Sequence, residues 1–146
     1  MSLTNFFENE LQALLFNNTT ISFLGDATGV VGSTADGSLY LALHTADPTE
    51  SPADQSASEA SYPGYVRQSV ARTSGGWTVT GATAANTAQI QFGAHAGGSP
   101  ASQSVTHFSV GFGDGGSPNA DQMLYSGGLQ STLNVTSGVN PTFAAG

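Results

Sequence analysis

The feature that most constrains the fold is an alternating segment, LYLALH, at residues 39–44. Its three leucines alternate with Tyr40, Ala42 and His44, and this period of two predicts a strand with one face in a core. Pro48 ends the segment, because proline has no N–H to donate to a neighbouring strand. The rest of the chain must therefore supply partner strands and cover the leucine face.

A long polar loop follows this strand. Nearly every side chain at residues 49–63 is small, polar or acidic, so we expect a surface loop that lies outside any core. Pro63 and Gly64 form a turn, after which residues 65–72 resume in extended form. The stretch predicts two strands that are joined by a long surface excursion.

Other alternating segments recur at short spacing and are separated by turn-rich stretches. We expect strands at residues 20–24, 77–80, 84–92, 105–112, 123–129 and 131–136. We expect surface loops at residues 25–38, 47–64, 93–104 and 113–121, and a short tail at residues 141–146. This number of short strands predicts a mainly β protein, an antiparallel β-sandwich of the jelly-roll or Ig-like kind.

One amphipathic helix is expected ahead of the strands, at residues 3–16, because apolar side chains recur there at helical spacing. Ser2 or Thr4 can cap its start. Two roles are open for this helix. It forms a lid over one end of the sheet, or it is a docking helix that binds a neighbouring subunit.

The length of 146 residues suits a single domain over residues 1–146, which would bury roughly 68–70% of its unfolded surface. The chain has no cysteine, which excludes disulfides, thiolate metal sites and cysteine nucleophiles. Packing and pairing alone must therefore stabilise the fold.

The charge balance excludes two classes of partner. Only two residues are basic, against ten acidic residues, and the formal net charge is −8. Binding to a phosphate backbone or to an anionic membrane surface depends on several Lys or Arg side chains. We therefore expect no nucleic acid and no membrane partner. We also expect no export signal, since no basic segment precedes an apolar one at the N-terminus.

Candidates for catalysis or metal binding are few. None of the common nucleotide-binding, hydrolase or zinc-protease motifs occurs. The three histidines, His44, His95 and His107, do not have the spacing of a metal site on a helix. We expect no catalytic residue, no metal site and no cofactor. Calcium binding by the oxygen-rich loop at residues 114–121 stays open, because its spacing differs from that of an EF-hand.

The two basic residues, Arg67 and Arg72, lie five apart on one expected strand, so they point to opposite faces. Each can pair with a carboxylate of its own chain or of a neighbouring subunit. Arg67 lies between apolar positions, so we expect it to be partly buried and paired. The residues that we expect at interfaces are Leu3, Phe7, Leu11, Leu14, Arg67, Arg72 and Trp77.

Eight segments in a fixed order carry a resemblance to a known family. They are MSLTNFFENELQALLF, LYLALHTADPTE, ASYPGYVRQSV, a central GW, ANTAQIQF, VTHFSVGF, LYSGGL and PTFAAG. Together they cover most of the chain, and LHTADP and GYVRQ are the most specific. This order resembles a family of small virion proteins of tailed bacteriophages, whose members are often described as tail fibre proteins. The resemblance implies a β-rich, oligomeric, non-enzymatic protein on the exterior of the head or tail.

The chain departs from this family pattern in two places. The loop at residues 25–38 is longer than the resemblance implies, which suggests a specialised contact there. The segment FAAG stands where a further closing strand is expected. An edge is then left open, or a partner supplies the missing strand.

We therefore expect a structural protein of a tailed-phage virion, and a capsid decoration or cement protein on the particle exterior comes first. A tail fibre or tail adaptor protein is the alternative. A carbohydrate-binding module is an alternative from another class, with stacking faces from Trp77, Tyr40, Tyr62 and Tyr65. The expected partners are the chain itself, as a homotrimer, and other virion proteins such as the major capsid protein.

Overall fold

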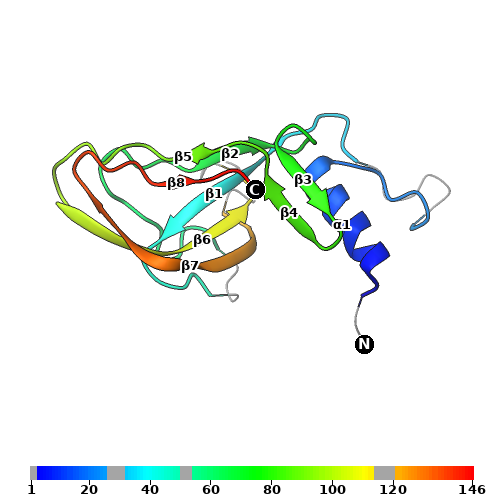
Figure 1. Cartoon of the computed structure of the whole chain (residues 1–146), viewed down its shortest axis with the longest axis horizontal. Helices are drawn as coiled ribbons and strands as arrows, with labels where there is room; N and C mark the ends of the chain where they lie inside the picture. Colours follow the sequence, from blue (N-terminus) through cyan, green and yellow to red (C-terminus); the bar gives the residue numbers. More distant parts are fainter. Residues whose placement is uncertain (1–2, 26–31, 50–53, 114–120) are drawn as a thin grey trace. The chain divides into compact units, whose positions relative to one another are not determined.

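The computed structural model describes residues 3–25, 32–49, 54–113 and 121–146. The expectation of a mainly β protein with antiparallel sheets and one helix near the N-terminus is confirmed (Figure 1). In chain order the elements are α1 (Asn5–Asn17), β1 (Ser38–His44), β2 (Gln68–Ala71), β3 (Trp77–Thr80), β4 (Thr83–Asn86), β5 (Ile90–Gln91), β6 (Ser102–Gly111), β7 (Met123–Thr136) and β8 (Thr142–Phe143).

By their internal contacts the residues form two compact units. The helical unit comprises Met1–Ser38, Val70–Gln89 and Ala144–Gly146. The sheet unit comprises Leu39–Ser69 and Ile90–Phe143. The expectation of one domain over residues 1–146 stays a prediction.

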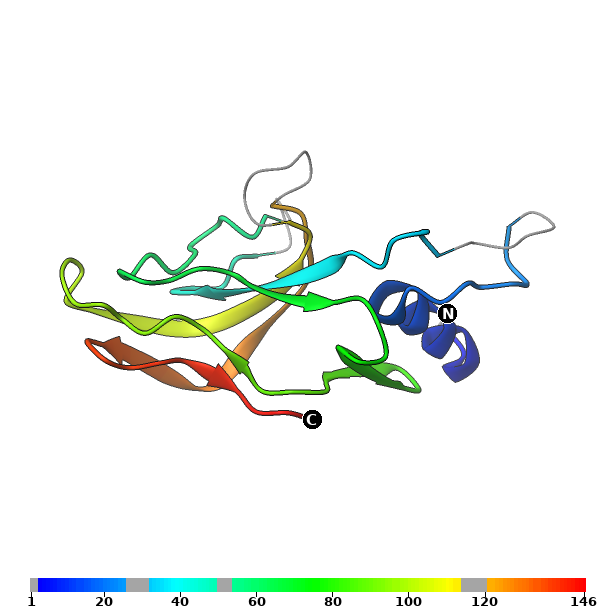
Figure 2. The same ribbon diagram turned by 90° about the horizontal axis from the view of Figure 1, so that it is seen from above.

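In the helical unit α1 packs on the β3–β4 hairpin (Figures 1 and 2). Thr4 is the N-cap, and its hydroxyl accepts a hydrogen bond from the Phe7 N–H at 3.3 Å. The helix ends where Asn18 takes a left-handed conformation with φ 55°, which asparagine tolerates. Phe16, the one buried residue of α1, meets the Trp77 ring edge to face at 4.8 Å. The helix is therefore held to the hairpin mainly through its C-terminal end.

The sheet unit contains two antiparallel sheets. The larger has the strand order β2-β1-β6-β7, and the smaller pairs β5 with β8. On the same face as the leucines of β1, the register with β6 places Val110 beside Leu41 and Phe108 beside Leu43. The apolar face that was expected on one strand thus continues across β6.

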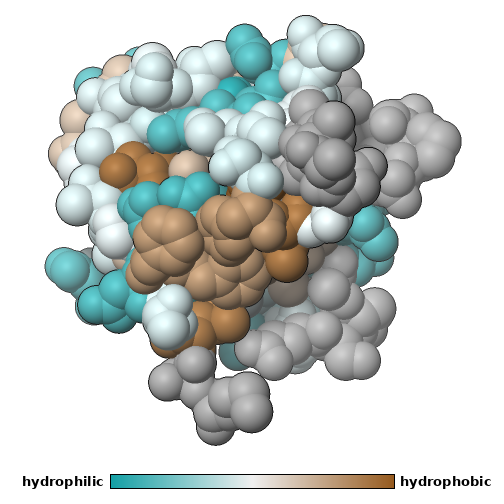
Figure 3. Space-filling model, turned by 90° about the vertical axis from the view of Figure 1, so that its right-hand side faces the viewer, coloured by the Kyte–Doolittle hydropathy of each residue, from teal (hydrophilic) through white to brown (hydrophobic). Residues whose placement is uncertain are grey.

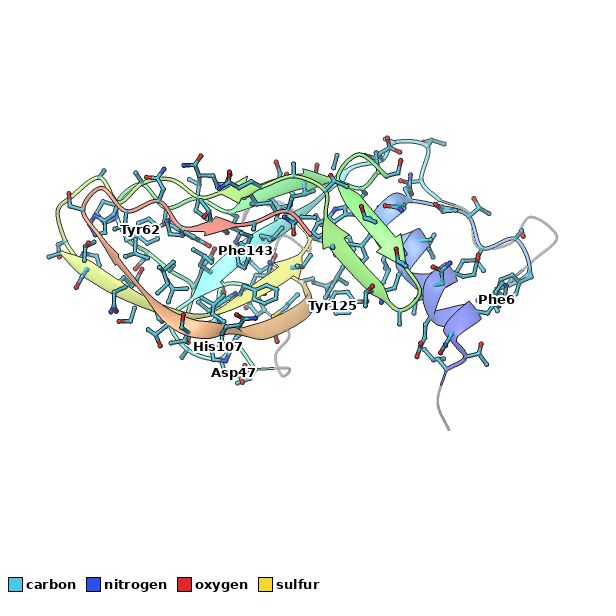
Figure 4. All side chains as sticks on the ribbon, in the orientation of Figure 1. Phe6, Asp47, Tyr62, His107, Tyr125 and Phe143 are labelled. Atoms are coloured by element: carbon cyan, nitrogen blue, oxygen red, sulfur yellow. The ribbon has the colours of Figure 1, made fainter. Side chains whose placement is uncertain are left out.

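Aromatic rings fill the space between these two sheets. Phe143 of β8 contacts Phe92 with ring centroids 6.0 Å apart and Phe108 of β6 with centroids 5.4 Å apart. Tyr62 stacks on His95 at 5.6 Å with an angle of 9° between the ring planes. Figure 4 shows Tyr62 and Phe143 both pointing into the sheet unit. This layer gives the unit the sandwich arrangement that the strand pattern predicted.

The loop after β1 also contributes buried residues, which was not expected. Gln55, Ala60 and Tyr62 are buried, although they lie in the loop that was expected to stay outside any core. The Ala60 N–H donates to the Leu43 carbonyl oxygen at 2.8 Å, so this segment is held against β1. For these three residues the expectation is wrong. Gln55 Nε2 is buried with hydrogen bonds to the Tyr40 carbonyl oxygen and the Ser109 hydroxyl, whereas Ser56, Ser58 and Ser61 of the same loop are exposed.

Three of the expected strands have different boundaries in the structure. Residues 84–92 belong to two strands, β4 and β5, instead of one. Conversely, the two strands expected at 123–129 and 131–136 form the single strand β7. The pairing of β7 with β6 shifts register between Val105 and His107. Alternation alone cannot show these differences, because the partner strand decides where pairing breaks.

Three shorter segments also differ. The expected tail at residues 141–146 contains β8, which pairs with β5 and so closes the smaller sheet. The expected loop at 93–104 ends earlier, because β6 begins at Ser102. Residues 20–24 form no strand beyond a bridge at Ile21.

Unfolding can be followed separately in the two units, because the only tryptophan lies in the helical unit and all four tyrosines lie in the sheet unit. If the chain is one cooperative domain, the urea transitions measured by Trp77 fluorescence and by tyrosine near-UV circular dichroism will share one midpoint. Two separate midpoints would instead show two independently folding domains.

Candidate functional site

Four interface residues were predicted on the N-terminal helix. Phe7, Leu11 and Leu14 lie on α1, whereas Leu3 precedes the helix, which begins at Asn5 and not at residue 3 as expected. None of them belongs to the core, since Leu3 is exposed and the other three are partly exposed. The helix instead buries Phe16 against the hairpin. These four apolar side chains, the apolar stripe, therefore remain accessible to a partner, and their interface role stays a prediction.

Two exposed aromatic residues beside this stripe were missed by the sequence analysis. Phe6 is 62% exposed and Phe23 is 55% exposed, and their ring centroids lie 5.2 Å apart. We define the N-terminal apolar patch as Leu3, Phe6, Phe23 and Leu24, all exposed in the helical unit; Figure 3 shows apolar side chains gathered on this face. The spacing of Phe6 from Leu3 could have revealed the first residue, whereas no sequence pattern places Phe23 beside the helix.

Arg67 is the centre of a charged cluster in the sheet unit. Its Nε and Nη2 atoms donate to the two carboxylate oxygens of Glu59, each at 2.7 Å. Nη2 also donates to Asp121 Oδ1 at 2.7 Å. The Arg67 side chain is only 7% exposed and that of Glu59 19%. The expectation that Arg67 is partly buried and paired is confirmed, with both partners in its own chain.

The same cluster includes Tyr65. Its hydroxyl donates to Glu59 Oε1 at 2.9 Å and accepts the Leu43 N–H at 3.0 Å. Burial, and next the charge of Glu59, raise the pKa of Tyr65, while the hydrogen bonds that Arg67 donates to Glu59 raise the pKa of Arg67. The phenol is therefore neutral and the guanidinium charged, so the cluster joins the loop, β1 and the segment just before β2 as a structural unit.

Arg72 holds the end of α1 within the helical unit. Its Nε donates to the Leu15 carbonyl oxygen at 2.8 Å, and its Nη2 donates to that of Leu14 at 3.0 Å. Carbonyls in the last turn of a helix lack intrahelical donors, and a cation there also suits the helix dipole. Both basic side chains of the chain are thus engaged with groups of the same chain.

The aromatic residues proposed to stack on carbohydrate are mostly not open. Trp77 and Tyr62 are buried, and Tyr65 is tied to Glu59. Burial also raises the pKa of Tyr62 to about 12. A sugar-binding platform needs an accessible ring face, which Trp77 and Tyr62 do not offer. The Trp77 ring packs on Phe16 of the same unit. The interface role that was expected for Trp77 stays a prediction.

A buried serine–histidine pair lies on the outer face of β1 and β6. His44 Nδ1 donates to the Ala57 carbonyl oxygen at 2.8 Å, so Nε2 accepts the Ser109 hydroxyl at 2.8 Å. Gln55 Nε2 donates to the same Ser109 oxygen at 3.1 Å. His44, Ser109 and Gln55 are all fully buried. No substrate could reach this serine, so the network holds the loop on the sheet.

Acid is expected to destabilise the sheet unit through His44. Burial, more than any other cause, lowers the pKa of His44. The unfolded chain therefore binds this proton more readily, so stability is full above about pH 6.5 and falls as the pH drops through that value and then through the folded pKa. Denaturation measured by tyrosine near-UV circular dichroism at pH 7.5 and pH 5.5 should show this loss. The His44→Gln variant keeps an acceptor for Ser109 and should lose less stability than the wild type between pH 7.5 and pH 5.5. An equal loss of stability in the two proteins would show that His44 is not the cause.

The structure shows little else that could carry chemistry. Among the described residues no group of three or more His, Asp or Glu side chains could hold a metal ion. The loop considered for calcium, residues 114–121, lies outside the described residues except for Asp121, which pairs with Arg67. In the same part of the chain no helix has the length and apolar character needed to cross a membrane.

Comparison with known families places a family model along the chain. The model described as "Podophage GP4 fiber I protein gp80" matches residues 2–146. The match therefore includes both the helical unit and the sheet unit. Among curated proteins no match was found.

Proposed function

The chain belongs to the podophage GP4 fiber I protein gp80 family, and we propose that it is a fibre subunit of a podophage tail that turns over no substrate. The match across residues 2–146 is the observation that carries this proposal, and it confirms the resemblance to small virion proteins of tailed phages. Of the two virion roles that the sequence left open, the family description favours the tail fibre over capsid decoration.

The polar clusters of the sheet unit support a structural role. Ser109 and His44 have the separation of a nucleophile and its base, but both are closed to solvent. The carboxylate of Glu59 is used by Arg67 and Tyr65, so it is not available as a general acid or base. These polar groups hold loops on a sheet, which is the use of polar clusters expected in a structural protein.

The tail assignment can be tested with phage that lacks the gene. We expect the mutant particles to release their genome at the same temperature as the wild type but to adsorb poorly to host cells. Antibody-labelled wild-type particles should show the protein at the tail in electron micrographs. A lower temperature of genome release with normal adsorption would support the capsid-cement alternative instead.

Self-association into a homotrimer is the second part of the proposal, and one strand supports it. β7 is an edge strand of 14 residues without a charged residue or a proline. Edge strands of monomeric proteins are usually protected by such residues, because an open edge pairs readily with another chain. The edge of β7 is therefore a surface that a second copy could extend.

Light scattering of the purified chain at tens of micromolar should give a trimeric mass. Lysines on the exposed side of β7, introduced as Ser126→Lys with Gln130→Lys, should lower that mass, since edge lysines oppose strand pairing. Ser74→Lys with Ala82→Lys adds the same charge at exposed positions outside the strands and should leave the mass unchanged. A monomeric mass for the unmodified chain would contradict self-association in solution.

A further inference from the structure

We propose that the N-terminal apolar patch is the docking surface for a different virion protein, one whose apolar surface is bordered by Lys or Arg side chains. The proposal rests on the proposed virion role and deepens it, because it identifies the surface and the partner chemistry that attach the chain to the particle.

The patch has the character of an interaction surface. Of the six large apolar residues that are exposed in the described part of the chain, four belong to it. The rings of Phe6 and Phe23 lie against each other, and Phe7 meets Phe23 at 6.4 Å, so the rings form one surface. Figure 4 shows Phe6 on the side of α1 away from the β3–β4 hairpin. Contiguous exposed aromatic rings of this kind mark binding sites in soluble proteins.

The charge beside the patch is acidic. Glu10 lies one helical turn after Phe6 and three residues after Phe7, so it shares their face of α1. Glu8 is in the first turn of the same helix, which contains no basic residue. A partner that covers Phe6 therefore brings its own rim close to Glu10.

A second copy of this chain has no Lys or Arg side chain to meet Glu10. The chain has only two basic residues, and both are already engaged. Arg67 binds Glu59 and Asp121, and Arg72 binds the carbonyls at the end of α1. With a net charge of −8, patch-to-patch contact between two copies would bring acidic rims together without compensation. Charge complementarity therefore favours a different chain with a basic rim.

The first experiment measures incorporation into particles. Phage that lacks the gene is grown in cells that express the wild-type chain, Phe6→Ser, Phe23→Ser or the control Val66→Ser, and the amount of the chain per purified virion is measured by mass spectrometry. Val66 is a matched control because it is 60% exposed and lies in the sheet unit. We expect the amount of the chain per virion to fall by about tenfold or more for the Phe6 and Phe23 variants, which is the effect of losing an interface hot spot. The amount should be unchanged for Val66→Ser.

Two further variants test the charge of the partner. Glu10→Lys should reduce incorporation more than Glu10→Gln, since it places a cation against a basic rim. Each variant is first checked for a melting temperature close to that of the wild type, which is expected because the substituted side chains do not belong to the core. Incorporation that rises with Glu10→Lys would contradict the basic rim.

A photoreactive phenylalanine analogue at position 6 then identifies the neighbour in assembled virions. An adduct with another virion protein supports the proposal, and an adduct of two copies of this chain overturns it. If the wild-type chain enters virions and both phenylalanine variants enter equally well, the docking surface is wrong while the virion role stands. If the wild-type chain is absent from virions, the proposed function itself fails, and the docking proposal with it.

Discussion

Arg67→Met is expected to lower the free energy of unfolding of the sheet unit by about 3–5 kcal/mol, the usual effect of removing one partner of a buried ion pair. The variant leaves the carboxylate of Glu59 without its two hydrogen bonds from the guanidinium, in a site where that side chain is only 19% exposed. Asp121 is more exposed, so water replaces part of its lost contact. Urea denaturation followed by tyrosine near-UV circular dichroism measures the loss.

Two variants separate the charge effect from simple loss of packing. Glu59→Gln in the Arg67→Met background should restore part of the stability, because it removes the uncompensated buried charge. Arg67→Lys should be only slightly more stable than Arg67→Met, since an ammonium group cannot bind both oxygens of Glu59 in the same planar geometry. If Arg67→Met melts at the wild-type temperature, the cluster is not important for stability.

Tyr62→Ala is expected to cost about 3–5 kcal/mol, the range for deleting a large buried aromatic side chain. Tyr62 is almost fully buried, stacks on His95, and meets the Tyr65 ring edge to face at 5.4 Å. Its removal opens a cavity in the aromatic layer and removes the contacts of this ring with His95 and Tyr65. Thermal unfolding of the variant should therefore begin at a markedly lower temperature.

Tyr62→Phe is the matched control. It keeps the ring and removes only the hydroxyl, which donates to the Gly93 carbonyl oxygen at 3.1 Å. That change should cost about 1 kcal/mol, the net value of an ordinary hydrogen bond. Equal losses for the alanine and phenylalanine variants would show that the hydroxyl matters more than the ring.

Local patterns predicted the elements that depend on nearby residues. The period of two in LYLALH predicted β1, and helical spacing with the cap at Thr4 predicted α1. The apolar neighbours Val66 and Val70 predicted that Arg67 is paired, because a guanidinium in such a strand is costly without a partner. Each of these conclusions follows from a repeat or a cost that acts within a few residues.

The pairing of distant segments was not predictable in the same way. The polar composition of residues 54–62 indicated a surface loop, but hydrogen bonds to β1 and to Ser109 allow Gln55 and the residues around it to be buried. Likewise, Arg67 could have chosen any of ten carboxylates, and only the fold brings Glu59 and Asp121 to it.

The sequence by itself determined the fold class, the helix and the central strand, because composition and periodicity act without reference to distant parts of the chain. Only the tertiary structure decided which carboxylates meet Arg67 and that Phe23 lies against Phe6, leaving both rings exposed. The physical reason is that side chains 17 or 54 residues apart in sequence, as Phe6 and Phe23 or Arg67 and Asp121 are, come together only when the chain folds back on itself.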